Sequence, residues 1–219
     1  MLDHALKLIA NGYTVIPAHD KRTNFKGWSE LSPGELNKKA IETLKNDSAG
    51  YYDGLAIRLK GTHLIDIDID CHDDNLTKMF IKKLLILASI PFSKSVALRG
   101  SKGYKFIFRI DNADYEAYNC DDFYKINTDR YLLNNYNEMV EIRNRQTMVY
   151  GVNNKEKNIY YRFMSNSLFN TPVSDLPIID LACVLVFRNQ CDLILHNMSN
   201  NFMLNNPNVI LNHFLLNLN

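Results

Sequence analysis

The 219-residue sequence predicts a mixed α/β domain of the α+β kind. Segments with apolar residues at helical spacing are interspersed with short segments in which apolar and polar residues alternate, as they do in half-buried strands. Hydrophobic residues make up 46% and charged residues 22% of the chain, which is ordinary for a globular protein that buries a core. No run of eighteen apolar residues occurs, so no membrane partner is expected.

The first half of the chain predicts two helices, two strands before the acidic region and one strand within it. Ser32 suits the N-cap of the second helix, and Pro33 suits its first helical position. The segment "KGT" around Gly61 predicts a hairpin-like turn between two strands. The expected elements are a helix over 2–12 that ends at Gly12, a strand over 13–18 stopped by Pro17, a helix over 32–45, and strands over 54–59 and 63–69.

The rest of the chain predicts more strands and two further helices. A polar stretch over 111–137, rich in Tyr and Asn, is interpreted as an insertion. The expected elements are helices over 73–89 and 178–189 and strands over 95–100, 104–110, 138–143, 146–151 and 158–163. The Asn-rich tail after 197 is read as a terminal helix or the start of a linker. We therefore expect one domain over 1–190 and a helical tail or linker over 191–219.

Charge and cysteine content limit the classes of partner. The net charge of +1 argues against a surface that is basic overall, so any nucleic-acid contact must be a local patch. The four cysteines show no CxxC spacing, which argues against a zinc site and favours reduced thiols in a cytoplasmic protein. The N-terminal segment lacks the apolar core of a signal peptide, which supports the same localisation.

The stretch "LIDIDID" over 64–70 places three aspartates at alternate positions of a predicted strand. Alternation puts Asp66, Asp68 and Asp70 on one face, about 6.6 Å apart, and the isoleucines on the other. Aspartate is a poor strand former, and like charges in a row repel each other unless a cation lies among them. One reading is a strand that shows its polar face to water. The other is a site for Mg²⁺ or Mn²⁺, which prefer carboxylate oxygens.

A second candidate is the segment "ALRGSKGYKFIFR". Its two glycines enclose a tight turn whose backbone N–H groups we expect to be free, and cations surround that turn. Such a turn suits a triphosphate, although a Gly-rich turn between two strands is also an ordinary hairpin. The candidate nucleotide-binding residues here are Arg99, Ser101, Lys102, Gly103 and Lys105.

A third candidate is "EMVEIRNRQTMVYG". Glu141 and Arg143 share one face of the predicted strand, with Val140 and Ile142 on the other. A two-metal site usually needs at least three carboxylates, and Glu141 would supply the third. Arg143 would then lie within reach of a phosphate.

In their order and spacing these motifs resemble the bifunctional primase-polymerase domain of the archaeo-eukaryotic primase superfamily, of the type found in plasmids, phages and other mobile genetic elements. The resemblance covers residues 5–180, from "GYTVIPAHDKRTNFKGW" through "AGYYDGLAIRLKGTHLIDIDID" and "RGSKGYKFIFR" to "VEIRNRQTMVYG". In that family the nucleotide-binding motif, which falls at "RGSKGYKFIFR" in this chain, usually ends in His. Here Lys105 stands at that position.

The resemblance implies an N-terminal α/β module packed on an RRM-like antiparallel sheet that bears the acids. It implies template-dependent primer synthesis and DNA polymerisation, with Asp66, Asp68 and Glu141 as catalytic residues that hold two Mg²⁺ or Mn²⁺ ions. The family has a pair of catalytic aspartates, which corresponds here either to Asp66 and Asp68 or to Asp68 and Asp70. In the first case, which we favour, Asp70 would be a supporting metal ligand. Lys105 and Arg143 would neutralise phosphate charge.

The implied partners are single-stranded DNA template and primer, NTP or dNTP, and a helicase domain or protein. Trp28 or the tyrosines of 111–137 are candidate stacking surfaces for bases. Two other functions stay open: a different metal-dependent phosphodiester enzyme such as a nuclease, and a catalytically silent member that binds nucleotide or nucleic acid.

Overall fold

The computed structural model describes all residues except 24, 26, 119–126, 134–135, 155–157 and 206–219. The described helices are α1 (Leu2–Ala10), α2 (Pro33–Lys45), α3 (Asp74–Leu87), α4 (Tyr115–Tyr118) and α5 (Leu181–Asn205). The described strands are β1 (Val15–Ala18), β2 (Gly54–Arg58), β3 (Leu64–Asp70), β4 (Val96–Arg99), β5 (Tyr104–Ile110), β6 (Tyr131–Leu133), β7 (Tyr136–Arg143), β8 (Gln146–Asn154), β9 (Ile159–Tyr160), β10 (Arg162–Phe163) and β11 (Ile178–Ile179). The mixed α/β class is therefore confirmed.

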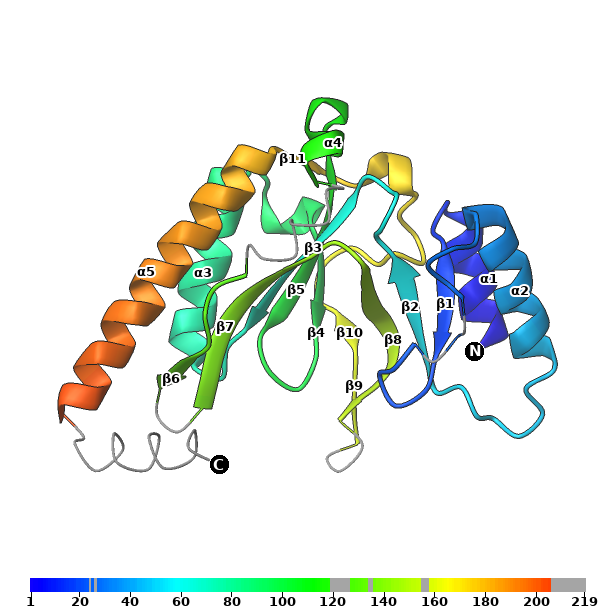
Figure 1. Cartoon of the computed structure of the whole chain (residues 1–219), viewed down its shortest axis with the longest axis horizontal. Coiled ribbons are helices and arrows are strands. Elements are labelled where there is room, and N and C mark those ends of the chain that lie inside the picture. The colour runs from blue at the N-terminus through cyan, green and yellow to red at the C-terminus, as the bar shows by residue number, and fades with distance from the viewer. Residues whose placement is uncertain (24, 26, 119–126, 134–135, 155–157, 206–219) are drawn as a thin grey trace.

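The strands form two sheets with mainly antiparallel pairing. The smaller sheet has the order β1-β2-β8-β9, and the larger one has the order β10-β4-β5-β3-β7-β6, with β11 parallel to β5. In Figure 1, α3 and α5 flank the larger sheet on the left, and α1 and α2 lie beside β1 on the right. The acidic strand β3 lies inside the larger sheet, between β5 and β7.

The turn around Gly61 does not form the predicted hairpin. The strand before it, β2, pairs with β1 and β8, whereas β3 pairs with β5 and β7, so the chain passes from one sheet to the other. The connection from β7 to β8 makes the reverse passage. Leu59 and Lys60 donate their backbone N–H groups to the carbonyl of Arg145, over 2.8 and 3.0 Å, which joins the two passages.

Local signals at the N-terminal helices behave as the sequence predicts. Ser32 caps α2 in a capping box with Glu35, and Pro33 begins the helix. Pro17, in contrast, does not stop its strand. It lies within β1, opposite Leu55, and β1 is an edge strand of its sheet, where a residue without an N–H group can be accommodated.

The isoleucines of β3 face the main apolar core, which lies between the larger sheet and the helices α3 and α5. Ile65, Ile67 and Ile69 are fully buried there, with Phe80 of α3 and Phe187 of α5. Because side chains alternate along a strand, the aspartates of β3 point away from this core, toward the smaller sheet.

Helix α5 continues well past residue 190, where the sequence analysis placed a domain boundary. Its Cys191 and Leu195 are fully buried in the same core as Phe187. The first part of the predicted tail thus packs on the sheet, and the rest of that tail, from 206 onward, lies outside the described residues.

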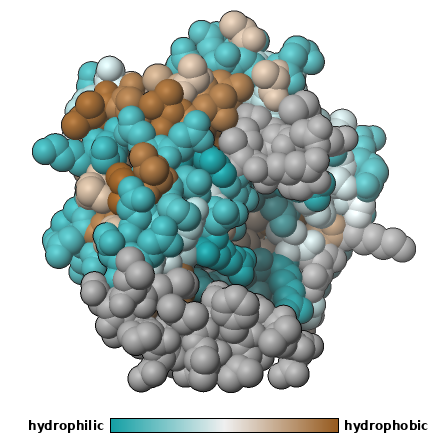
Figure 2. Space-filling model, turned by 60° about the vertical axis from the view of Figure 1, so that its left-hand side comes forward, coloured by the Kyte–Doolittle hydropathy of each residue, from teal (hydrophilic) through white to brown (hydrophobic). Residues whose placement is uncertain are grey.

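A second core joins the two sheets. Leu55 and Ile57 of β2 pack there with Leu98 of β4 and Ile107 of β5. In the described part of the chain no helix is long and apolar enough to cross a membrane. The face of the molecule drawn in Figure 2 is mostly hydrophilic around a central hollow and bears a hydrophobic patch toward its upper left.

Candidate functional site

Between the two sheets lies a cleft of about 300 Å³ into which most of the predicted site residues point. The strands β3, β5 and β7 of the larger sheet form one wall, and β8 with the segment after β9 forms the other. The turn between β4 and β5 and the loop after β1 border the opening. The lining residues are Lys21, Asp68, Asp70, Gly100, Ser101, Lys102, Tyr104, Lys105, Arg143, Met148, Asn153 and Tyr161.

Strand pairing places Asp68 at the centre of the charged residues. Lys105 of β5 lies opposite Asp68 on one side, and Glu141 of β7 lies opposite it on the other. Directly opposite residues in an antiparallel pair have Cβ atoms about 4.5–5.5 Å apart and lie on the same face. Glu141 therefore lies on the same face as Asp66 and Asp68, as a third metal ligand would require, and its role stays a prediction.

The guanidinium of Arg143 lies among three carboxylates. Its Nη2 is 2.7 Å from Asp68 Oδ2 and also contacts Glu141 Oε2, and its Nη1 is 3.9 Å from Asp66 Oδ2. Burial by itself would lower the pKa of Arg143, but Asp68, Asp66 and Glu141 together raise it above its ordinary value. Arg143 is thus the internal counter-ion of the acidic strand, a contact that the sequence analysis had not predicted.

Asp66 is the most deeply buried of the acids. Its side chain is fully buried, and neither carboxylate oxygen has a hydrogen-bond partner. Burial raises its pKa to about 6; Lys105 and Arg143 oppose the rise, and Asp68 adds to it. Asp66 does not line the cleft directly, because Arg143 lies against it.

Asp70 lies at the more open end of the acidic strand. Its Oδ2 is 3.0 Å from Nζ of Lys102, on the turn between β4 and β5. Burial and the neighbouring Asp68 raise its pKa, and the contact with Lys102 opposes that rise. Asp68 and Asp70 therefore reach the cleft directly, whereas Asp66 lies beneath them.

Lys105 points into the site, as the alternation of its strand predicts. Its Nζ is 3.6 Å from Asp68 Oδ2, 3.3 Å from Thr147 Oγ1 and 5.3 Å from the centre of the Tyr161 ring. Its strand neighbours Phe106 and Phe108 face the opposite way, into the apolar core. Within the part of the chain that the structure describes, Lys105 is the one cation of β5 that forms an ion pair with an acid of β3.

The turn over 100–103 differs from its prediction in one respect. The backbone N–H of Ser101 is not free, because it donates to Oδ1 of Asn153 over 2.6 Å. Gly103 has a φ of +57°, and a Cβ there would lie 1.7 Å from the carbonyl oxygen of Ile69. Glycine at 103 is thus required by the close approach to β3, and the Ser101 N–H is already engaged within the protein.

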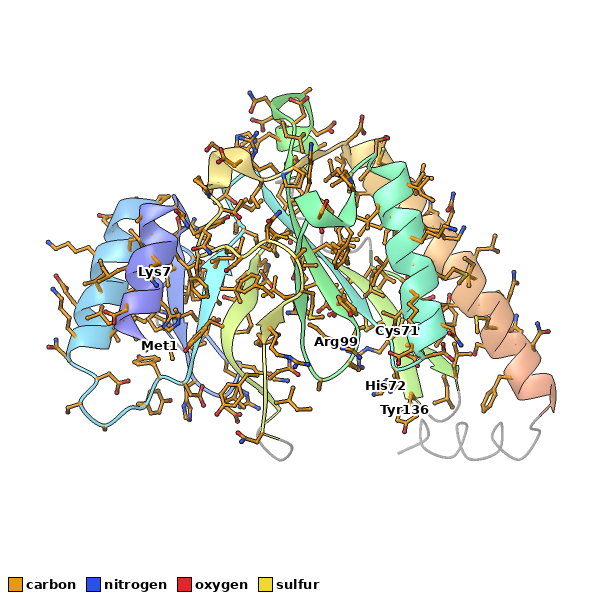
Figure 3. All side chains as sticks on the ribbon, turned by 180° about the vertical axis from the view of Figure 1, so that it is seen from behind. Met1, Lys7, Cys71, His72, Arg99 and Tyr136 are labelled. Carbon is orange, nitrogen blue, oxygen red and sulfur yellow. The ribbon has the colours of Figure 1, made fainter. Side chains whose placement is uncertain are left out.

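Arg99 is a predicted nucleotide-binding residue that the structure does not bring into the cleft. It is opposite Tyr104 in the β4–β5 pair, one position along from Lys105, so it lies on the other face of the sheet. Its guanidinium is 3.6 Å from Asp74 at the start of α3 and stacks on the Tyr104 ring. Figure 3 shows Arg99 on the side of the sheet where Cys71 and His72 precede α3.

Six residues of the cleft were not predicted as site residues: Lys21, Gly100, Tyr104, Met148, Asn153 and Tyr161. Lys21 is in the loop after β1 and has a lowered pKa, caused by burial and by the nearby Lys105. The one sequence signal for it was the lysine-containing loop within the family resemblance. Asn153 and Tyr161 gave no signal, because their place depends on how β8 and the segment after β9 fold back over the larger sheet.

Trp28, a predicted stacking surface, packs partly buried against a small apolar cluster that includes Phe25 and Leu36. It does not line the cleft. Of the tyrosine-rich segment, residues 119–126 and 134–135 lie outside the described residues, and the described tyrosines of the segment do not line the cleft either.

The acids agree with the predicted metal ions in donor chemistry. The two carboxylate oxygens of Asp66, which make no hydrogen bond and lie next to Asp68 on the same face as Glu141, are the kind of donor that Mg²⁺ and Mn²⁺ prefer. The arrangement, however, is closed by Arg143. Among the described residues no group of three or more His, Cys, Asp or Glu side chains is placed to hold a metal ion. Arg143 must move before Asp66, Asp68 and Glu141 can share an ion.

No protein-family model matches this chain, and no curated protein matches it significantly in sequence.

Proposed function

We propose that this chain is a primase-polymerase core that makes and extends primers by template-dependent nucleotidyl transfer to a 3′-hydroxyl. One observation supports the proposal above the others. Asp68 lies between Glu141 on one side and Lys105 on the other, at the wall of a cleft that lies between two sheets. Acids for metal ions and cations for phosphates thus adjoin in a space large enough for the phosphates of a nucleotide.

The charge balance of the site favours metal-dependent binding. Around the cleft, Lys21, Lys102, Lys105 and Arg143 face the acids Asp66, Asp68, Asp70 and Glu141. Because four positive groups face four acids, no excess positive charge is left to neutralise a triphosphate. A nucleotide therefore needs additional positive charge in order to bind tightly, and divalent ions are the usual source in phosphoryl and nucleotidyl transfer.

Asp66, Asp68 and Glu141 would hold the Mg²⁺ or Mn²⁺ ions, with Asp70 at the mouth of the site. When bound, the ions supply activation of the 3′-hydroxyl and neutralisation of the triphosphate and the leaving pyrophosphate. Once the acids have another cation, the Arg143 guanidinium is free to pair with phosphate oxygens, which suit its planar fork. Lys105 and Lys102 line the same cleft and contribute point charges to the phosphates.

The arrangement of the larger sheet supports the same proposal. Strands β4, β5, β3 and β7 are antiparallel neighbours with α3 and α5 on one face and the acids on the other, an RRM-like layout. In this proposal the smaller sheet, with α1 and α2, is the N-terminal module of the primase core. The partners in this proposal are a single-stranded DNA template and primer, NTP or dNTP, and a helicase domain or protein.

Primer extension tests the proposal. The purified chain is incubated with a labelled primer–template, with either dNTP or NTP, and with Mg²⁺ or Mn²⁺; omitting the primer tests for initiation. We expect elongation that requires the metal and the templated base, and that is abolished in Asp68→Asn. The control is Asp3→Asn, which makes the same chemical change at an exposed position of α1. No incorporation under any of these conditions would contradict the proposal.

The position of Arg143 favours a second candidate, a catalytically silent module that binds nucleotide. An arginine that neutralises three carboxylates permanently would substitute for the metal ions. This candidate predicts that nucleotide binding, measured by calorimetry, is unchanged by Mg²⁺ or EDTA and that no primer is extended. Tight binding only with Mg²⁺ supports the polymerase, and metal-dependent cleavage of DNA without incorporation would indicate a nuclease.

A further inference from the structure

A second cavity, of about 400 Å³, lies at the opposite end of β3 and β5 from the acidic cleft. Its floor is the pair Leu64 and Arg109, which are opposite each other where β3 begins and β5 ends. Arg109 lies four positions from Lys105 on the same face of β5, or about 13 Å along the strand. The side chain of Ile107, in the core between the sheets, lies between the two sites.

Segments from both parts of the fold meet at this cavity. Gly12 and Thr14 come from the connection between α1 and β1, and Pro33 from the start of α2. His63 and Arg109 come from the larger sheet and its adjoining turn, and Val173 comes from the segment before β11. A ligand bound here would therefore contact both the N-terminal helices and the larger sheet.

Two buried nitrogen atoms at the cavity have no hydrogen-bond partner in the described part of the chain. Nε of Arg109 is buried and makes no hydrogen bond, and none of the described ion pairs involves its guanidinium. Nδ1 of His63 is also buried without a partner, while the His63 ring stacks on Tyr115 with centroids 4.2 Å apart. A buried guanidinium donor without an acceptor is costly, and an anion supplied by a ligand would satisfy it.

The other walls define the rest of the ligand. Leu64, Ile110 and Val173 offer apolar surface, and the one acid that lines the cavity, Asp111, is exposed. The volume lies within the range of small-molecule sites. We propose that this cavity binds a small organic anion, whose phosphate or carboxylate group pairs with Arg109 and whose apolar part packs on Leu64, Ile110 and Val173.

Four simple probes separate the parts of this proposal. Phenyl phosphate and benzoate combine an apolar ring with each kind of anionic group, inorganic phosphate has the anionic group alone, and benzyl alcohol has the ring alone. Binding to the full chain is measured by calorimetry and by the shift in melting temperature that a ligand specific for the folded state produces. We expect phenyl phosphate or benzoate to bind more tightly than both single-part probes, and the better of the two identifies the anionic group.

Variants then locate the binding. Arg109→Gln should weaken the better probe at least tenfold, or about 1.4 kcal/mol, and Arg109→Lys should weaken it less because the charge remains. Lys105→Ala, in the acidic cleft, and Arg130→Gln, at an exposed position, should leave the affinity unchanged. Arg109→Lys also serves if Arg109→Gln does not fold.

Three outcomes would overturn the proposal. The first is that neither anionic ring compound binds the wild-type chain. The second is that benzyl alcohol binds as tightly as they do, which would make the cavity an apolar site. The third is that binding is lost in Lys105→Ala and kept in the Arg109 variants, which would place the anion in the acidic cleft. Because the test needs no primer extension, its result is independent of the proposed polymerase activity.

Discussion

Replacing Asp66 by Asn should make the folded protein more stable at neutral pH. Asp66 is fully buried, its oxygens have no hydrogen-bond partner, and Asp68 is its neighbour on the same face. Asparagine keeps the shape of the side chain and removes the charge. The substitution therefore removes the cost of burying a carboxylate while it leaves the packing of β3 nearly unchanged.

The size of the effect follows from the pKa of Asp66, which is raised from 3.8 to about 6 by burial. The folded state holds this proton more tightly than the unfolded chain does. The free energy of unfolding therefore falls as the pH rises from about 4 to about 6 and stays lower above that range. A shift of about two units, at about 1.4 kcal/mol per unit, corresponds to about 3 kcal/mol. This is the gain expected for Asp66→Asn at pH 7–8, and the gain should vanish near pH 4.

Urea denaturation at pH 4, 5, 6, 7 and 8 measures the difference, with EDTA present so that no metal ion contributes. Repeating the pH 7 measurement with Mn²⁺ adds a second test. If Asp66 is a metal ligand, Mn²⁺ should stabilise the wild type more than Asp66→Asn, because an ion that binds the folded state adds to its stability. Asp3→Asn, at an exposed position, is the matched control and should change neither curve appreciably.

The reasoning would be refuted if Asp66→Asn were less stable than the wild type at pH 7, or if both proteins showed the same pH dependence between 4 and 6. In that case the Arg143 and Lys105 cations would stabilise the charged form more than burial opposes it. A Mn²⁺ effect of equal size in both proteins would leave the burial argument intact and would remove Asp66 from the metal ligands.

Three further predictions follow from the same site. Arg143→Gln should lower the free energy of unfolding at pH 7 by about 2 kcal/mol, less than the loss of a fully buried ion pair, because the Arg143 side chain is 32% exposed. Denaturation curves should show that acid or Mn²⁺ restores part of this loss. Lys105→Ala should raise the apparent KM for nucleotide about ten- to hundredfold, since one charged hydrogen bond is worth about 1.5–3 kcal/mol, and Lys105→His should recover activity as the pH falls; an unchanged KM would remove Lys105 from the nucleotide site. Gly103→Ala should lower the melting temperature by several degrees because of its positive φ and the clash with Ile69, whereas Gly34→Ala, in open space on α2, should not.

Much of the site could be predicted because it depends on local alternation. Asp66, Asp68 and Asp70 share a face in any strand that contains them, and Lys105 must face away from Phe106 wherever its strand lies. Arg99, a predicted nucleotide-binding residue, does not reach the cleft. It is close to Lys102 in sequence, but the turn that joins β4 to β5 puts it on the opposite face from Lys105.

By itself, the sequence determined the α/β class, the cap of α2, the buried isoleucine face and the acidic face of β3. Each of these depends on residues within one helix or strand. Only the tertiary structure decided that β5 and β7 are the neighbours of β3, that Arg143 lies among the acids, and that Asn153 holds the turn at Ser101. The reason is physical: side-chain direction follows from backbone geometry, whereas strand order and register result from burying apolar surface between segments far apart in the chain.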